Sequence, residues 1–68
     1  MGVRIRLNGE ERQFEAPLDV RGLLATLGLD PTKIAVERNL EIVPRSRYSD
    51  VTLEDGDKLE IVQFIGGG

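Results

Sequence analysis

"VRIRLNGEERQFEA", residues 3–16, alternates apolar and polar side chains on both sides of Asn8-Gly9. Alternation with a period of two is typical of a strand with one buried face. An Asn-Gly pair readily adopts the positive φ angles of a tight hairpin turn. The segment therefore predicts two antiparallel strands whose arginines face water. The core face of this hairpin is expected to consist of Val3, Ile5, Leu7, Phe14 and Ala16.

A short amphipathic helix is predicted within PLDVRGLLATLGL, residues 17–29. Asp19 can cap its first turn with a carboxylate, and Gly28 can end it in the left-handed conformation. Gly22 lies inside the helix, where glycine costs stability, and we expect it to let a strand approach closely. The apolar residues at helical spacing are Val20, Leu23, Leu24 and Leu27.

Three more strands are predicted in the second half of the chain. KIAVER (33–38) and LEIVP (40–44) indicate two short strands, the second ended by a proline, which cannot donate to a ladder. KLEIVQF (58–64) is the last and most apolar strand. Residues 54–57, Glu-Asp-Gly-Asp, are expected to form a solvated turn before it. Tyr48 is expected to act as a lid over the edge of the core.

The order of elements is strand, strand, helix, strand, short strand, strand. A helix between the first hairpin and the later strands must cover one face of the sheet, which indicates a two-layer α+β domain. With the last strand beside the first, this is the β-grasp (ubiquitin-like) fold: a mixed sheet, one main helix packed on one face, and a flexible C-terminal tail. We expect residues 1–65 to form the domain and residues 66–68 to form the glycine tail.

Composition argues against several classes of function. The 68 residues suffice for one small domain, and a net charge of −3, with basic residues scattered among acidic ones, offers no stripe for nucleic acid. Without cysteine or histidine, the chain lacks the common nucleophile, general base and zinc ligands. We therefore expect no catalytic residue, no metal and no bound cofactor, with any chemistry supplied by partner enzymes. The chain shows no signal peptide or membrane span, so a cytoplasmic protein, monomeric when free, is expected.

The glycines at the end of the sequence are the first candidate site. Glycine has no Cβ, so Gly66 and Gly67 could thread through a narrow channel of a partner enzyme. The terminal carboxylate of Gly68 would then be the reactive group. The alternative is a frayed end without a role.

The last strand carries the second candidate site. If Leu59 and Ile61 point into the core, Val62 and Phe64 lie on the face away from the helix. These two residues, extended by Ile65, are candidate partner-binding residues. The alternative is that a bend, a bulge or the LEIVP segment covers them.

Most of the chain resembles a known family. NLEIVPRSRY (39–48) and VTLEDGDKLEIVQFIGGG (51–68), with the RLNGE opening and the leucine-rich helix, resemble the ThiS family of sulfur-carrier proteins of thiamine biosynthesis. The resemblance implies that an E1-like, ThiF-like adenylyltransferase consumes ATP to adenylate the carboxylate of Gly68. A sulfur donor system then forms a thiocarboxylate, which gives its sulfur to a ThiG-like thiazole synthase.

Other functions stay open at the level of sequence. Sulfur carriers for molybdopterin, tRNA thiolation or cysteine synthesis share the fold and the diglycine. The molybdopterin-synthase small subunits, however, typically approach the diglycine through prolines, where this chain has Gln63-Phe64-Ile65. Outside this class, the chain could be a β-grasp interaction module with an inert tail, or a protein tag joined to lysines. Loss of Gly68 should separate an inert tail from an active one.

Overall fold

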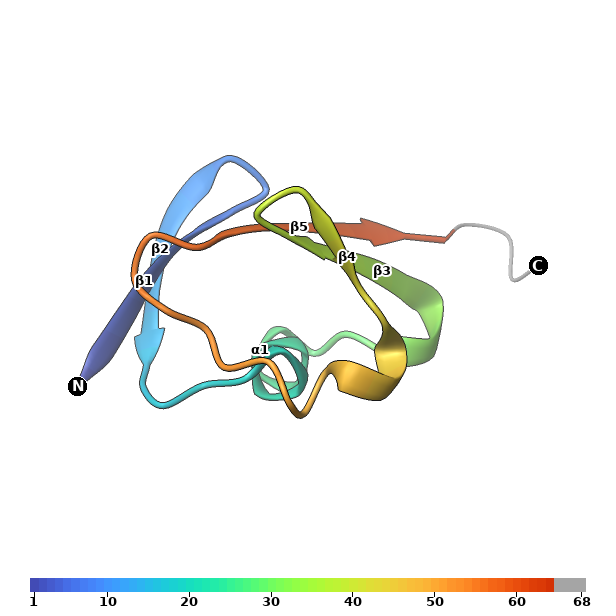
Figure 1. Cartoon of the computed structure of the whole chain (residues 1–68), viewed down its shortest axis with the longest axis horizontal. Helices are drawn as coiled ribbons and strands as arrows, with labels where there is room; N and C mark the ends of the chain where they lie inside the picture. The colour runs from blue at the N-terminus through green and yellow to red at the C-terminus, as the bar shows by residue number, and fades with distance from the viewer. Residues whose placement is uncertain (65–68) are drawn as a thin grey trace.

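The computed structural model describes residues 1–64, and within them five strands form one sheet with an α-helix against one face (Figure 1). The strands are β1 (Gly2–Leu7), β2 (Glu10–Glu15), β3 (Ile34–Arg38), β4 (Glu41–Val43) and β5 (Lys58–Gln63). The helix α1 spans Val20–Leu27, and short 3₁₀ turns span Pro31–Lys33 and Arg45–Arg47. The predicted boundary between residues 65 and 66 lies outside the described residues.

The sheet is mixed, with the order β2-β1-β5-β3-β4. β5 lies in the middle, where it pairs in parallel with β1 and antiparallel with β3. The prediction that the last strand runs beside the first is thus confirmed. The register with β1 covers Lys58 and Leu59, and the register with β3 covers Leu59 to Gln63.

The first hairpin forms as the sequence predicts. Asn8 and Gly9 take positive φ angles of 49° and 85°, and the register places Val3 opposite Phe14. Val3, Ile5 and Leu7 are buried, while Phe14 and Ala16 pack half-buried against them. Alternation along β1 therefore separates a core face from an outer face of the sheet.

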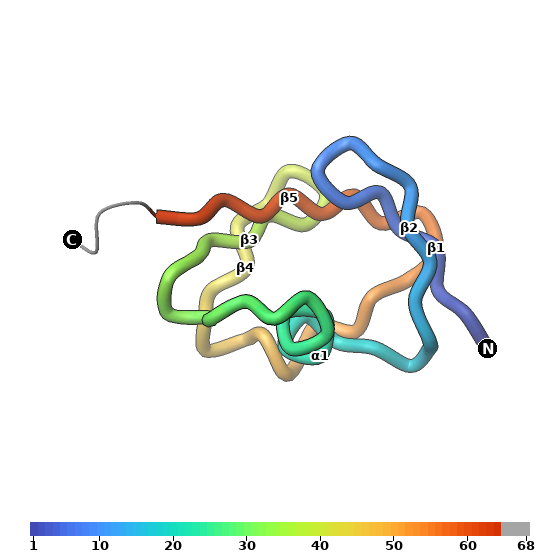
Figure 2. Tube along the Cα trace, turned by 180° about the vertical axis from the view of Figure 1, so that it is seen from behind, coloured from blue at the N-terminus to red at the C-terminus, as the bar shows by residue number. Residues whose placement is uncertain are grey.

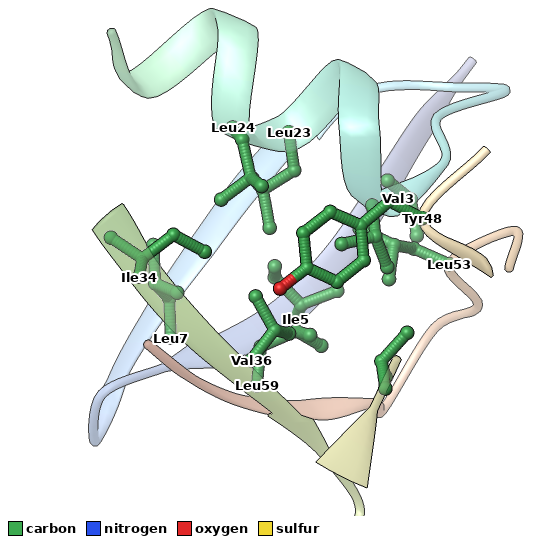
Figure 3. Packing of buried hydrophobic residues seen from close by; sticks show 12 residues of the cluster. Val3, Ile5, Leu7, Leu23, Leu24, Ile34, Val36, Tyr48, Leu53 and Leu59 are labelled. Atoms are coloured by element: carbon green, nitrogen blue, oxygen red, sulfur yellow. The ribbon is translucent and has the colours of Figure 1, made fainter. Parts of the chain in front are cut away.

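A single hydrophobic cluster fills the space between the helix and the sheet. Figure 3 shows Leu23 and Leu24 pointing from α1 toward the sheet, with the Tyr48 ring in the same cluster. Tyr48 is buried, which confirms its predicted place at the core. The buried apolar residues are Val3, Ile5, Leu7, Val20, Leu23, Leu24, Ile34, Val36, Val43, Tyr48, Leu53 and Leu59.

Both predicted ends of the helix are observed. The Asp19 carboxylate accepts a hydrogen bond from the backbone N–H of Gly22 at 2.7 Å. Gly28 closes the helix at a φ of 72°, and the N–H of Leu29 donates to the carbonyl of Leu24. The expectation that a strand packs closely on Gly22 is wrong. A Cβ there would lie 2.9 Å from the Leu18 side chain and 3.3 Å from the Asp19 carboxylate, so the N-terminal cap itself occupies that space.

The turn before β5 is not simply solvated, because Asp57 is only 6% exposed. Its carboxylate accepts hydrogen bonds from the backbone N–H of Glu54 (2.8 Å), from Arg38 Nε (2.9 Å) and from Asn39 Nδ2 (3.0 Å). The prediction of a solvated turn is therefore wrong at Asp57. This carboxylate ties the turn to the end of β3, 19 residues away in sequence.

The same contacts make stability depend on pH. Burial by itself would raise the pKa of Asp57. The bonds from Glu54, Asn39 and Arg38 outweigh it and hold that pKa below its ordinary value. A carboxylate with a depressed folded pKa contributes stability that is fully present above the unfolded pKa, about 4. This contribution disappears as the pH falls through the lower folded pKa.

We predict that Asp57→Asn lowers the free energy of unfolding by about 1–3 kcal/mol at pH 7, because it leaves Arg38 without its buried anion. Urea unfolding of the variant and the wild type at a series of pH values measures the difference. It should shrink progressively below about pH 4. The pKa of Asp30 is lowered too, by the hydrogen bond from the backbone N–H of Thr32, but both proteins share that effect. A difference that does not change with pH would contradict the assignment to Asp57.

Candidate functional site

The outward side of β5 carries exposed apolar residues. Leu59 is buried and Ile61 packs against the core, so alternation turns Val62 and Phe64 to the opposite face. Val62 is 60% exposed and Phe64 is 57% exposed. The predicted exposure is confirmed, and neither a bulge nor the β4 segment covers them. Figure 2 shows β5 running along the sheet toward the end of the molecule opposite the N-terminus.

Two more apolar residues extend this surface, and sequence reasoning missed both. Ile42 in β4 is 64% exposed, and Leu40 in the β3–β4 turn is 84% exposed. In the register, Ile42 lies opposite Glu37, and Val62 lies opposite Ala35, two residues earlier on β3. Residues in direct register share a face, so Ile42 and Val62 are on the same side of the sheet.

We call these four residues, Leu40, Ile42, Val62 and Phe64, the apolar patch. Ile42 and Val62 lie on the outer face of the sheet, opposite the face that the helix covers, and Glu37 and Glu60 lie on the same face. Scattered exposed apolar side chains are normal, but several large ones on one face of a sheet are typical of a protein-binding surface. A signal for Ile42 was present in the sequence: once Val43 points inward, its neighbour in the strand must point outward.

Leu40 has an unusual backbone. The turn places Asn39 at a φ of 52° and Leu40 at 71°, both in the left-handed region. Asn39 is well suited to this conformation and is anchored: its backbone N–H donates to the Lys58 carbonyl, and its side-chain oxygen accepts from the Lys58 N–H. For leucine the left-handed region costs about 1–2 kcal/mol. Such strain together with exposure of an apolar side chain is a feature of functional sites.

Phe64 follows β5 and is the last residue that the structure describes. Its backbone N–H donates to the Lys33 carbonyl at 2.9 Å, so the main chain is held beside the start of β3 up to this residue. The other predicted site residues, Ile65, Gly66, Gly67 and Gly68, lie outside the described residues. The apolar patch therefore adjoins the point from which the predicted tail begins.

Residues 1–64 show no sign of a metal site, a membrane-spanning helix or a buried ligand site. Within that range, no group of three or more acidic side chains is placed to hold a metal ion. No helix in the same part of the chain is long and apolar enough to span a membrane. Every buried side-chain nitrogen and oxygen there has a hydrogen-bond partner, so no orphaned polar group marks a ligand.

The central C-terminal strand, the single helix layer and the apolar patch define a ubiquitin-like β-grasp protein. The family model described as the ThiS family matches residues 5–68, and the chain belongs to that family. The crystal structure of the thiamine biosynthesis protein ThiS from Geobacter metallireducens superimposes with a TM-score of 0.82 at 30% identity. That comparison covers 97% of this chain and 100% of the other, and it confirms the predicted fold.

Two relatives bear on the function. The sulfur carrier protein ThiS of Bacillus subtilis is 40% identical over 65 residues, which are 94% of this chain and 98% of that protein. A thiazole synthase of Paramagnetospirillum magneticum is 61% identical over 66 residues. That match covers 97% of this chain but only 20% of the synthase, so the chain spans a fifth of that relative's length.

Proposed function

We propose that this chain is a sulfur carrier for thiazole formation in thiamine biosynthesis, with the sulfur held as a thiocarboxylate at Gly68. The observation that carries the proposal is the nearly end-to-end match to the Bacillus subtilis sulfur carrier. The match to part of a thiazole synthase supports thiazole formation as the destination of the sulfur. The absence of cysteine and histidine is consistent with a carrier on which other enzymes act.

The proposed chemistry takes place on the carboxyl group of Gly68. A carboxylate oxygen attacks the α-phosphorus of ATP on a ThiF-like adenylyltransferase, and pyrophosphate leaves. Hydrosulfide then attacks the acyl carbon, the C–O bond to AMP breaks with its electron pair, and a thiocarboxylate remains. With a protein persulfide as donor, the terminal sulfur attacks instead. A thiol then splits the acyl disulfide, giving the thiocarboxylate and a new disulfide.

The chain's own contribution to this chemistry is presentation. Gly66 and Gly67 carry no Cβ, so they suit a narrow channel that leads to the ATP site of the enzyme. Ordering such a tail costs about 1–2 kcal/mol per residue, which docking elsewhere must offset. The apolar patch, with Ile65, supplies this docking surface. Burial of large apolar side chains there would provide the affinity.

Intact mass spectrometry tests the proposal. The 68-residue chain is incubated with ATP, the ThiF-like enzyme and sulfide, and the expected mass gain is that of one oxygen replaced by sulfur. Omission of ATP should prevent the gain. Consumption of the product by a ThiG-like thiazole synthase would separate thiamine biosynthesis from the other sulfur pathways. An unchanged mass, with an enzyme shown to be active on another carrier, would indicate an interaction module instead.

Leu40 offers a test of the patch that cannot be confused with unfolding. We predict that Leu40→Gly raises the free energy of unfolding by up to about 1 kcal/mol, because glycine adopts a φ of 71° without strain. The same change should weaken binding to the adenylyltransferase by roughly 10- to 100-fold, since a leucine side chain buried at an interface contributes about 1.5–3 kcal/mol. Chemical denaturation and calorimetric titration measure the two effects.

Leu40→Asn is the matched variant, because asparagine also tolerates the left-handed region but is polar. It should behave like Leu40→Gly in both measurements. Unchanged binding in both variants would remove Leu40 from the docking surface.

A further inference from the structure

A second feature of the outer face lies beside the apolar patch. β1 and β5 run parallel, and their register places Arg6 directly opposite Lys58. The next pair in the register, Leu7 and Leu59, is buried on the helix side. Arg6 and Lys58 therefore project together from the outer face. We call them the cationic pair. Like charges in direct register destabilise a sheet, so this placement has a cost in the free protein.

Carboxylates lie near the cationic pair, Glu37 and Glu60 among them, but none of them is close enough to form an ion pair with it in the part of the chain that the structure describes. Within residues 1–64, neither Arg6 nor Lys58 takes part in an ion pair. Glu11 lies opposite Arg6 on β2, but its carboxylate lies 3.7 Å from Nε of Arg4. The Arg6 guanidinium donates one hydrogen bond, at 3.2 Å, to the carbonyl of Gly9, which leaves most of its donors available. Neither positive charge is therefore held in an ion pair, on a protein whose net charge is −3.

The surface around the cationic pair is hollowed on both sides. A hollow of about 520 Å³ lies toward β2 and the turn before β5, and a smaller one of about 170 Å³ lies toward the β3–β4 turn. Arg6 and Lys58 line both. The smaller hollow is also lined by Leu40 of the apolar patch and by Glu37 and Glu60, so its charges balance. In the larger hollow the lining carboxylates already contact Arg4: Glu11 lies 3.7 Å from its Nε, and Asp55 accepts a hydrogen bond from its backbone N–H at 2.8 Å. An incoming carboxylate can therefore reach the cationic pair from the larger hollow, while its neighbours contact Leu40 on the other side.

We propose that the cationic pair is a docking subsite for a carboxylate side chain of the adenylyltransferase, used together with the apolar patch. This inference rests on the proposed function and names the chemistry of the partner surface: apolar residues flanked by an acidic one. Arginine offers a fork of donors and lysine a compact charge, and both bind carboxylates by charge-assisted hydrogen bonds. Because both cations are exposed at the rim of the patch, they act mainly on the association rate.

The test measures association of the carrier with the adenylyltransferase by stopped flow at several ionic strengths. Arg6→Gln/Lys58→Gln should slow association roughly three- to tenfold at low salt and should flatten its dependence on salt. The matched control, Arg12→Gln/Arg21→Gln, changes the net charge by the same amount. Arg12 lies in register with the buried Ile5, and Arg21 lies on α1, so both are on the other side of the sheet. This control should associate at nearly the wild-type rate.

Arg6 also supports the hairpin turn through its hydrogen bond to the Gly9 carbonyl, so its substitution could affect folding. Lys58→Gln alone is the control, because it leaves that bond in place. The single variant should show a smaller decrease of the same kind. Equal slowing by both double variants would overturn the subsite, because net charge alone would then explain the effect. An unchanged rate in Arg6→Gln/Lys58→Gln would overturn it as well. Failure of the wild-type chain to bind the enzyme would overturn the subsite and the proposed function together, so the two failures are distinguishable.

Discussion

Deletion of Gly68 is expected to abolish thiocarboxylate formation completely while leaving the free energy of unfolding unchanged. The acyl carbon that is adenylated belongs to Gly68 in the proposed chemistry, and a shortened tail would not reach the same position in the enzyme. The stability of the fold should not change, because Leu59 is the last buried residue of the core and Phe64 makes the last described backbone hydrogen bond. Intact mass after incubation with ATP, enzyme and sulfide measures the first effect. Urea unfolding measures the second.

Gly67→Ala is the companion variant, because it keeps the terminal carboxylate and adds only a methyl group beside it. We expect it to fold normally and to gain sulfur more slowly, since the methyl narrows the clearance in the channel. If the chain that ends at Gly67 acquires sulfur at the full rate, the enzyme does not recognise the length of the tail, and the threading hypothesis is wrong. Normal turnover of Gly67→Ala would also argue against threading.

Most of the features that the sequence predicted correctly depend on local interactions. The pairing of the last strand with the first is the exception, and it followed from the order of the elements. Asn8-Gly9 sets a hairpin turn through the φ angles of two residues, and Asp19 and Gly28 define a helix through bonds within a single turn. Alternation along β5 then sufficed to place Val62 and Phe64 on the outer face. Each of these inferences needs only neighbours in sequence.

Two of the features that were missed depend on pairing between distant segments. Asp57 is buried because Arg38 and Asn39, 19 and 18 residues away, supply its hydrogen bonds. The sequence of the acidic turn alone does not indicate that contact. The like-charge pair of Arg6 and Lys58 arises only from the parallel register of β1 and β5. A sequence pattern can assign a face to each residue, but register decides which residues meet across strands.

The helix glycine is a third case. The sequence shows that Gly22 weakens the helix but not why a side chain is absent there. In the structure, Leu18 and the Asp19 carboxylate fill the space that a Cβ would need. The cap and the glycine are therefore one arrangement, in which the N–H of Gly22 is also the donor to Asp19. Such a correlation between a cap and a position three residues later requires coordinates.

The apolar patch should also be essential for docking, and Val62→Asp tests this most severely. We expect binding to the adenylyltransferase to weaken by more than about 100-fold, because an unpaired carboxylate would be buried against apolar side chains. The fold should survive with a loss of about 1 kcal/mol or less, since Val62 is 60% exposed and the change costs mainly strand propensity. Calorimetric titration of the enzyme with each variant measures the affinity, and urea unfolding checks the fold.

Two controls separate the loss of apolar contact from the added charge. Val62→Thr keeps the β-branched shape and should weaken binding by only about tenfold. Ser46→Asp adds the same charge at an exposed position of the 3₁₀ turn Arg45–Arg47, outside the apolar patch, and should bind like the wild type. The patch offsets the cost of ordering the tail. When the carrier concentration is too low to saturate the enzyme, the rate of sulfur loading should therefore fall in proportion to the affinity. Full-rate loading of Val62→Asp under those conditions would show that the tail alone is recognised, and the apolar patch would then have no part in the carrier reaction.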